Sequence, residues 1–311
     1  MTPKILLTGG TGQVGHELLR FLPHVGEVVA PGRHDLDLTQ PDRIRSIVRK
    51  IRPNLIVNAA AYTAVDDAET ERSACHAANV EAPAVLAEEA KKAGATIVHY
   101  STDYVFDGTA TAPYDELAPA CPVNFYGQTK LEGERAIQSS GVPHLILRLA
   151  WVYGTHRHNF LLTVLGLAAQ REELRIVRDQ IGAPTWCREI ARATARVLAE
   201  NSRPSSSGGL MLRLSGTFNL TAGGETSRCA FAQAIVEESQ RCRQQPPWLQ
   251  AITQNHPLRA RQIVPISSGE YPTAARRPAR SLLSNARFEN EFGFCLPDWR
   301  AQLHSVFAED R

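Results

Sequence analysis

TGGTGQVG, residues 8–15, follows the first apolar run of the chain, KILLT (4–8), and leads into a segment with helical spacing. Its glycines, Gly9, Gly12 and Gly15, form a G-x-x-G-x-x-G pattern related to the dinucleotide fingerprint. There, glycine permits a tight turn, a close approach of the backbone to a pyrophosphate, and close packing of helix on strand. A tight strand–helix turn alone would also use glycine, but this position favours a phosphate-binding loop at a helix N-terminus.

The first half of the sequence alternates apolar runs with helical patterns. We expect strands over 4–8, 27–30, 54–61, 96–102 and 144–153. We expect helices over 13–22, 71–93 and 125–139, and one more that starts with Thr39 as N-cap and Pro41 in its first turn. This alternation predicts an α/β fold with a doubly wound parallel, Rossmann-like sheet.

Beyond residue 160 the pattern is less regular. Helices are expected over 161–169, 190–198, 228–238 and 296–309, strands over 174–177 and 216–221, and a flexible surface loop over 201–209. We therefore predict a cofactor-binding Rossmann domain over residues 1–155. Residues 156–311 should form mainly a smaller, irregular α/β lobe that binds substrate, with some later elements returning to the first domain.

Composition excludes several classes of protein. The net charge of +2 is too small to argue for a nucleic-acid or membrane partner, and no apolar run approaches the ~20 residues that span a bilayer. The N-terminal residues lack the layout of a signal peptide. The cysteines show no metal-binding spacing and suggest a reduced, cytoplasmic protein without zinc. They are Cys75, Cys121, Cys187, Cys229, Cys242 and Cys295.

The choice of nicotinamide cofactor depends on VVAPGRHDLD (28–37). NAD-binding chains usually place a carboxylate at the end of this strand to bind the adenosine ribose. Here Ala30 and Pro31 stand at that end and Arg33 follows, a residue suited to a 2′-phosphate. This favours NADP. Asp35 and Asp37 are close behind, and Arg33 could equally be a solvated loop charge, so use of NADH is left open.

VNFYGQTK (123–130) places Lys130 four residues after Tyr126, on the same face of a helix. A phenol with its ordinary pKa near 10 is a poor proton donor at neutral pH. A nearby ammonium would favour the phenolate and lower that pKa, which makes Tyr126 a candidate general acid. An exposed tyrosine–lysine contact without function is the alternative.

A third motif lies where the strand over 96–102 leaves the sheet at Ser101, Thr102 and Asp103. Ligands of open parallel sheets bind beyond the carboxyl ends of the strands, so these side chains would lie where a substrate carbonyl binds. Serine and threonine are also common at strand ends. Together with the glycine loop and the Tyr-x-x-x-Lys spacing, they favour carbonyl reduction or the reverse oxidation.

With these motifs the sequence resembles the extended short-chain dehydrogenase/reductases, and within them the dTDP-4-dehydrorhamnose reductases of nucleotide-sugar biosynthesis. The similarity runs over nearly the whole chain. It includes TGGTGQVG (8–15), NAAAYTAVDDAE (58–69), STDYVFDG (101–108), YGQTKLEGE (126–134), RLAWVYG (148–154), DQIGAPT (179–185) and YPTAARRP (271–278).

The resemblance implies that NADPH reduces the C4 keto group of dTDP-4-dehydro-L-rhamnose to dTDP-L-rhamnose. Tyr126 would protonate the developing alkoxide, Lys130 would hold the nicotinamide ribose and lower the phenol pKa, and Thr102 would hydrogen-bond the carbonyl. Besides Tyr126 and Lys130, the implied cofactor-binding residues are Gly9, Thr11, Gly12, Gln13, Val14, Gly15, Arg33, Asp37, Leu38, Ala59, Ala60 and Ala61. The implied substrate-binding residues are Ser101, Thr102, Asp103, Trp151, Asn159, Ala183, Pro184 and Arg276, with Arg277 beside the last.

Several positions depart from the family pattern. Arg228 stands where the family usually has tryptophan, and Arg280 where asparagine is common, so the exact sugar is less certain than the reduction. Some relatives dimerise through a metal held by glutamates. Glu17 could match one of them, but Glu189 is out of register by one and Ala286 replaces another, so we predict no metal.

Two other functions stay open. One is a reductase or epimerase acting on another nucleotide-linked sugar. The other is a non-enzymatic regulatory subunit that keeps the cofactor site. We expect a monomer or a homodimer.

Overall fold

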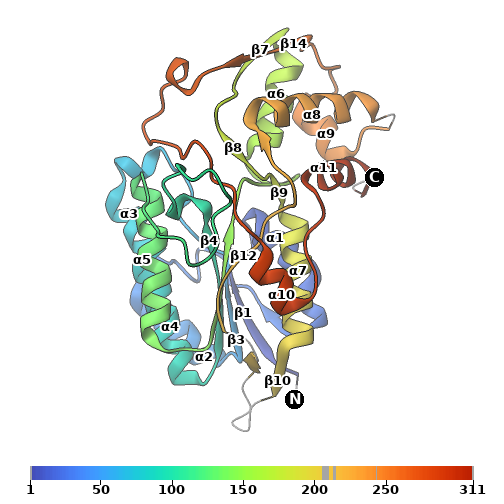
Figure 1. Cartoon of the computed structure of the whole chain (residues 1–311). Coiled ribbons are helices and arrows are strands. Elements are labelled where there is room, and N and C mark those ends of the chain that lie inside the picture. The colour runs from blue at the N-terminus through green and yellow to red at the C-terminus, as the bar shows by residue number, and fades with distance from the viewer. Residues whose placement is uncertain (1, 205–209, 213–214, 243, 310–311) are drawn as a thin grey trace.

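In the computed structural model, residues 2–204, 210–212, 215–242 and 244–309 are described. The centre is a six-stranded, all-parallel sheet with the order β12-β5-β4-β3-β1-β2 (Figure 1). This confirms the predicted doubly wound α/β fold. The strands are β1 (Lys4–Thr8), β2 (Glu27–Val29), β3 (Leu55–Asn58), β4 (Thr96–Thr102), β5 (His144–Leu149) and β12 (Gly216–Asn219).

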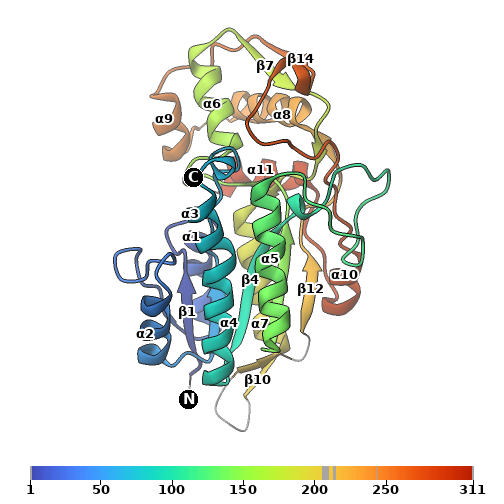
Figure 2. The same ribbon diagram turned by 90° about the vertical axis from the view of Figure 1, so that its left-hand side faces the viewer.

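Helices cover both faces of the sheet (Figures 1 and 2). On one face lie α1 (Gln13–Phe21), α7 (Cys187–Asn201) and α10 (Ala286–Phe292). On the other lie α2 (Pro41–Ile51), α4 (Ala82–Ala93) and α5 (Phe125–Ser140). The later elements α7, α10 and β12 thus pack with the first half of the chain. No described helix is long and apolar enough to cross a membrane.

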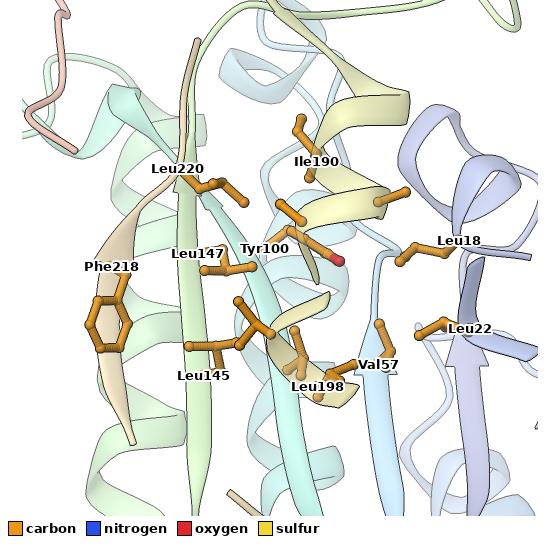
Figure 3. Packing of buried hydrophobic residues seen from close by; sticks show 14 of the residues in the cluster. Leu18, Leu22, Val57, Tyr100, Leu145, Leu147, Ile190, Leu198, Phe218 and Leu220 are labelled. Atoms are coloured by element: carbon orange, nitrogen blue, oxygen red, sulfur yellow. The ribbon is translucent and has the colours of Figure 1, made fainter. Parts of the chain in front are cut away.

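Alternate side chains of each strand supply the two cores. Leu145, Leu147 and Tyr100 face α1 and α7, where they pack with Leu18, Ile190 and Leu198 among others (Figure 3). Ile146, between Leu145 and Leu147, and Ile97, three residues before Tyr100, face α2, α4 and α5 instead. Because both faces bury apolar side chains, the strands are nearly continuous apolar runs, as the sequence predicts.

The smaller lobe has its own apolar core. Its helices are α6 (Phe160–Gln170), α8 (Arg228–Arg241), α9 (Pro247–Thr253) and α11 (Trp299–Glu309). Short strand pairs accompany them: β6 (Val152–Tyr153) with β9 (Thr185–Trp186), β7 (Glu173–Val177) with β14 (Gln262–Ile266), and β8 (Ile181–Gly182) with β13 (Thr226–Ser227). In both views the lobe lies above one end of the sheet (Figures 1 and 2).

The remaining elements are short. They are α3 (Arg72–His76), β10 (Ser202–Pro204), β11 (Leu210–Leu212), the 3₁₀ turns η1 (Leu22–His24), η2 (Asp67–Glu69), η4 (Asp103–Val105) and η5 (Ser268–Glu270), and the π-helical turn η3 (Ala77–Glu81). The π turn links α3 to α4 within the run predicted as one helix. Pro83 follows it, and since proline has no N–H to donate, a regular α-helical bond there is missing.

Three local predictions were wrong. The N-cap of α2 is Gln40, because the Thr39 hydroxyl donates to Asp37 Oδ1 (2.8 Å) instead. The strand expected over 144–153 is broken at Trp151, whose φ of 46° turns the chain from β5 into β6. Within the loop expected over 201–209, Ser202–Pro204 pairs with β11, and 205–209 lie outside the described residues.

Candidate active site

The glycine loop between β1 and α1 is packed so closely that side chains would not fit. Gly9 has a φ of 70°, and a Cβ atom there would lie 2.6 Å from the backbone nitrogen of Ala60. A Cβ atom on Gly15 would lie 2.0 Å from the Gly9 carbonyl oxygen. That oxygen accepts a hydrogen bond from the Gly12 N–H (2.8 Å). The sequence therefore has glycine where the turn and the helix–strand contact require it.

The N-terminus of α1 is open to a ligand. Its N-cap is Gly12, and no side chain caps the first turn, so backbone N–H groups there remain for an anion. Thr11 is exposed, and the Oε1 atom of Gln13 is buried without a partner among the described residues. Val14 packs against both large cores, which fixes the start of the helix. This cradle fits the pyrophosphate of a dinucleotide such as NADP(H).

A loop of the smaller lobe lies against the glycine loop, which the sequence did not predict. The carbonyl oxygen of Thr11 accepts a bond from Arg157 Nε (2.9 Å) and lies 3.2 Å from His156 Nε2. The imidazole of His156 stacks on that of His16 in α1, with ring centroids 4.5 Å apart. Arg157 has a φ of 63°, a conformation uncommon for residues other than glycine. Basic groups therefore flank the expected phosphate site.

The far end of the cofactor site lies beyond β2. Arg33 is exposed, and among the described residues no carboxylate forms an ion pair with it. Asp37 is already engaged: its carboxylate accepts bonds from the backbone and hydroxyl of Thr39, which lower its pKa. Leu38 is half-buried against the core below α2. A free guanidinium and an occupied carboxylate suit the 2′-phosphate of NADP. Ala59, Ala60 and Ala61 follow β3 directly and are half-buried.

Thr102 and Tyr126 meet at the carboxyl end of β4. Thr102 is the last residue of β4, and Tyr126 lies in the first turn of α5, which Asn124 caps by accepting from the Gly127 N–H (2.8 Å). The Thr102 hydroxyl donates to Asp103 Oδ1 (3.1 Å) and accepts from the Tyr104 N–H (3.2 Å). Burial raises the pKa of Tyr126 above its ordinary value, an effect that the nearby Thr102 side chain only partly opposes. The phenol is therefore held protonated, the form that can donate a proton.

The Lys130 side chain is anchored to β4. Its ammonium is buried and donates to the Tyr100 carbonyl (2.7 Å), with His99 Nε2 at 3.2 Å. Burial lowers the pKa of Lys130 to about 8. Spacing on the helix placed Tyr126 and Lys130 on one face, but the lysine side chain extends towards β4.

Two buried polar atoms at the carboxyl end of β4 lack partners among the described residues. The hydroxyl of Ser101 and the Oδ2 atom of Asp103 are buried and have no hydrogen bond among the described residues. Burial raises the pKa of Asp103 to about 6. Buried polar groups are nearly always paired in folded proteins, so unpaired ones next to a phenol indicate a place for ligand hydroxyl or carbonyl groups.

Trp151 is covered by Arg228 from the start of α8. The Arg228 Cζ atom lies 3.7 Å from the indole centroid and 5.0 Å from that of Phe160. Burial lowers the pKa of the Arg228 guanidinium, and the nearby Tyr104 and Asp103 side chains only partly oppose this. The backbone of Gly182 packs against the same indole, and a Cβ atom there would lie 2.5 Å from its ring. The indole that the resemblance assigns to sugar binding is thus covered on one face by Arg228.

The two adjacent arginines of YPTAARRP have different surroundings. Arg277 forms a two-bond ion pair with Asp66, with both N–O distances 2.6 Å. Arg276 is exposed, and its side chain lines a cavity of about 490 Å³ with Asp179, Ser268 and Tyr271. Only Arg276 keeps its guanidinium for a ligand such as a diphosphate.

Asn159, Ala183 and Pro184 are buried within the lobe. The Asn159 side chain caps α6 by accepting from the Leu162 N–H (3.3 Å), and it donates to the Gly154 carbonyl (2.8 Å). Ala183 and Pro184 form the buried turn between β8 and β9. The structure thus shows these three residues buried in the lobe, with the Asn159 side chain already hydrogen-bonded within it.

Glu17 and Glu189 are both in ion pairs. Arg188 contacts Glu17 at 3.0 Å with both side chains buried, and Arg192 contacts Glu189 at 2.6 Å. Within residues 2–309, apart from the gaps given above, no cluster of three or more His, Cys, Asp or Glu side chains could hold a metal.

Comparison with known proteins places this geometry in a family. Residues 3–311 match the family described as the RmlD substrate binding domain. The chain belongs to that family. A relative named dTDP-4-dehydrorhamnose reductase from Burkholderia thailandensis is 48% identical over 297 residues, 96% of this chain and 95% of the relative. Another of that name from Escherichia coli K12 is 37% identical over 311 residues, 98% of this chain and 97% of the relative.

Solved structures agree with this RmlD family membership. A dTDP-4-dehydrorhamnose reductase from Bacillus anthracis in complex with NADP has a TM-score of 0.86 at 29% identity, covering 99% of this chain and 100% of that one. A UDP-glucose 4-epimerase from Thermus thermophilus in complex with NAD has a TM-score of 0.75 at 17% identity, covering 99% of both chains, and shows a shared fold alone.

In this RmlD-family chain, the predicted residues fall into two groups. The glycine loop, the alanines after β3, and Thr102, Asp103 and Tyr126 are brought to one end of the sheet. Asn159, Ala183 and Pro184 instead support the fold. The sequence did not single out His99, Tyr104, His156 and Arg157. The basic run Thr155–His158 was a signal for the last two, while nothing in the motif spacing pointed to His99.

Proposed function

We propose that this chain catalyses the NADPH-dependent reduction of the C4 keto group of dTDP-4-dehydro-L-rhamnose to dTDP-L-rhamnose. Bound NADPH supplies the hydride. Tyr126 donates its proton to the sugar oxygen as negative charge develops there, and Thr102 hydrogen-bonds that oxygen. The observation that carries the proposal is the arrangement of Thr102, at the end of β4, and the buried Tyr126, at the start of α5, at the same end of the sheet as a glycine loop built for a dinucleotide.

The two parts of the chain divide the work. Residues 1–155 bind the cofactor, with Arg33 on its 2′-phosphate and Lys130 on its nicotinamide ribose. Residues 156–311 mainly bind the nucleotide sugar, with Arg276 on the diphosphate side and Trp151 near the sugar. The open α1 N-terminus and the exposed, unpaired Arg33 support the first assignment. The cavity beside Arg276 supports the second.

Turnover is tested by NADPH oxidation with enzymatically prepared dTDP-4-dehydro-L-rhamnose, with NADH in parallel. Tyr126→Phe should lower kcat by about 10²–10⁴-fold, the range for a lost general acid, with nearly unchanged NADPH affinity. Wild-type activity in the Tyr126→Phe variant would contradict the assigned acid. No turnover by folded wild-type protein would contradict the reductase, and comparable rates with UDP- or GDP-linked keto sugars would contradict the dTDP assignment.

The chain is further proposed to act in the cytoplasm as a monomer or homodimer. All six cysteines are free, which suits a reducing compartment. Size-exclusion chromatography with light scattering distinguishes the two assemblies.

A further inference from the structure

A buried series of polar side chains connects the strand before the glycine loop to Lys130. Thr8 ends β1, Asn58 ends β3, His99 lies in β4 and Lys130 in α5. All four residues are 1–2% exposed. Thr8 Oγ1 lies 2.6 Å from Asn58 Oδ1, Asn58 Nδ2 lies 3.0 Å from His99 Nδ1, and His99 Nε2 lies 3.2 Å from Lys130 Nζ. The series runs under the expected cofactor site, from the phosphate end to the catalytic end.

The protons of this series can be counted. A charged lysine has three donors and no acceptor, and a neutral histidine has one of each. If the Asn58 amide donated to His99 Nδ1, the histidine proton would sit on Nε2 and point at the Lys130 ammonium. Two donors would then face each other in a buried site. A doubly protonated His99 would be worse, and burial together with Lys130 lowers its pKa well below the ordinary value.

One arrangement matches donors with acceptors between Asn58, His99 and Lys130 when Lys130 is charged. With the Asn58 amide turned by half a rotation, a change that exchanges nearly equivalent atoms, Oδ1 faces His99 and Nδ2 faces Thr8. His99 then donates from Nδ1 to Asn58 and accepts at Nε2 from Lys130. The Tyr100 carbonyl is the second acceptor of the ammonium, at 2.7 Å.

We propose that His99 is a positioning residue for Lys130, holding its ammonium through Nε2 as the neutral Nδ1–H tautomer. His99 and the Tyr100 carbonyl bind two of the three ammonium N–H groups, which leaves the third for the nicotinamide ribose. The Asn58 amide passes no proton on, so the series holds the lysine and does not conduct protons to solvent. The inference rests on the proposed function in one respect, the contact between Lys130 and the cofactor.

The tautomer is measured directly, without sugar or cofactor. The full-length chain is labelled with ¹⁵N-histidine, and long-range ¹H–¹⁵N correlation spectra are recorded at about pH 6.5, below the pKa of Lys130. The His99 signals are those absent from the His99→Gln spectrum. Protonated Nδ1 with unprotonated Nε2 supports the proposal. A proton on Nε2, or on both nitrogens, overturns it.

Cofactor binding supplies the second test, by fluorescence titration with NADPH. His99→Leu removes the acceptor and should weaken NADPH binding about 10-fold, the effect of losing one hydrogen bond to a charged group. His99→Gln, which keeps an acceptor and a donor, should stay within about 3-fold of the wild type. The control is Thr194→Val, which removes a buried bond to the Tyr100 hydroxyl (2.9 Å) on the other face of β4.

The outcomes separate positioning from general disruption of the sheet. Wild-type NADPH affinity in folded His99→Leu overturns the proposal, as does an equal loss in Thr194→Val. If His99→Leu does not fold, the tautomer and the His99→Gln affinity decide. Both readouts are made without substrate, so failure of the proposed sugar reduction would not be mistaken for failure of this inference.

Discussion

The guanidinium of Arg228 lies over the indole of Trp151, with Cζ 3.7 Å from the ring centroid. The same guanidinium lies near Tyr104 and Asp103, and among the described residues no carboxylate forms an ion pair with it. The sequence showed Arg228 only as a departure from the family pattern. The fold places that departure beside Trp151 and near Asp103, where the sugar is expected.

Replacing Arg228 should therefore affect the sugar and not the cofactor. We expect Arg228→Met to raise KM for the dTDP sugar by about 10-fold, through loss of hydrogen bonds from a desolvated cation. Arg228→Lys, which keeps the positive charge, should raise KM for the dTDP sugar by less than Arg228→Met does. The control is Arg196→Met, which removes a guanidinium 4.1 Å from the Phe294 ring on a half-exposed helix face. Unchanged sugar KM in Arg228→Met would show that this side chain only packs.

Gly15→Ala should abolish tight NADPH binding. The added Cβ atom would lie 2.0 Å from the Gly9 carbonyl oxygen, so the loop must move. We expect NADPH affinity to fall by at least about 10-fold and unfolding free energy to fall by roughly 1–3 kcal/mol. Gly166→Ala is the matched control, because outside its own helix backbone nothing lies within 4 Å of the added Cβ. That helical substitution should be neutral or stabilise by about 1 kcal/mol, and equal losses in both variants would refute the steric argument.

The buried Glu134–Arg148 pair fixes α5, which carries Tyr126, to β5. Arg148 bonds both Glu134 oxygens, at 3.0 and 2.7 Å, with side chains 6% and 1% exposed. Arg148→Met leaves the buried Glu134 carboxylate without its cation and should lower the free energy of unfolding by about 3–5 kcal/mol, as measured by denaturant titration. The double variant Glu134→Leu/Arg148→Met should regain most of that lost stability. Arg175→Met, from an exposed pair with Glu270, should cost less than about 1 kcal/mol. If Arg148→Met lowered the free energy of unfolding by as little, the Glu134–Arg148 pair would not be what fixes α5 to β5.

The pH dependence of cofactor binding should reflect the ionisation of the Lys130 side chain. Burial lowers its pKa to about 8, while burial keeps Tyr126 protonated throughout the neutral range. A lysine is charged below its pKa, so cofactor capture should be intact below about pH 8 and decline as pH rises through that value. The measurement is kcat/KM for NADPH between about pH 6 and pH 10, since this ratio reports groups of the free enzyme. A profile flat to about pH 10 would show that Lys130 is not the titrating group.

Much of the fold could be predicted because it depends on local pattern. Apolar runs of strand length, separated by helical periodicity, are sufficient to predict a parallel sheet covered on both faces. The failures were also local in cause. Thr39 was expected to cap α2, but its hydroxyl bonds Asp37, and Trp151 adopts a left-handed conformation that divides a strand. Local hydrogen-bond and backbone preferences decide where a helix is capped or a strand ends. The periodicity of apolar residues carries no information about these preferences.

The sequence by itself determined the strand–helix alternation, the glycine loop after β1, and the order in which Thr102, Tyr126 and Lys130 follow it. These features follow from residue type and spacing along one chain. Only the tertiary structure decided that Lys130 is held by His99 and Tyr100, that Arg228 covers Trp151, and that Arg157 bonds the loop at Thr11. Those contacts join residues up to 146 positions apart, and their geometry depends on how strands, helices and the lobe pack together.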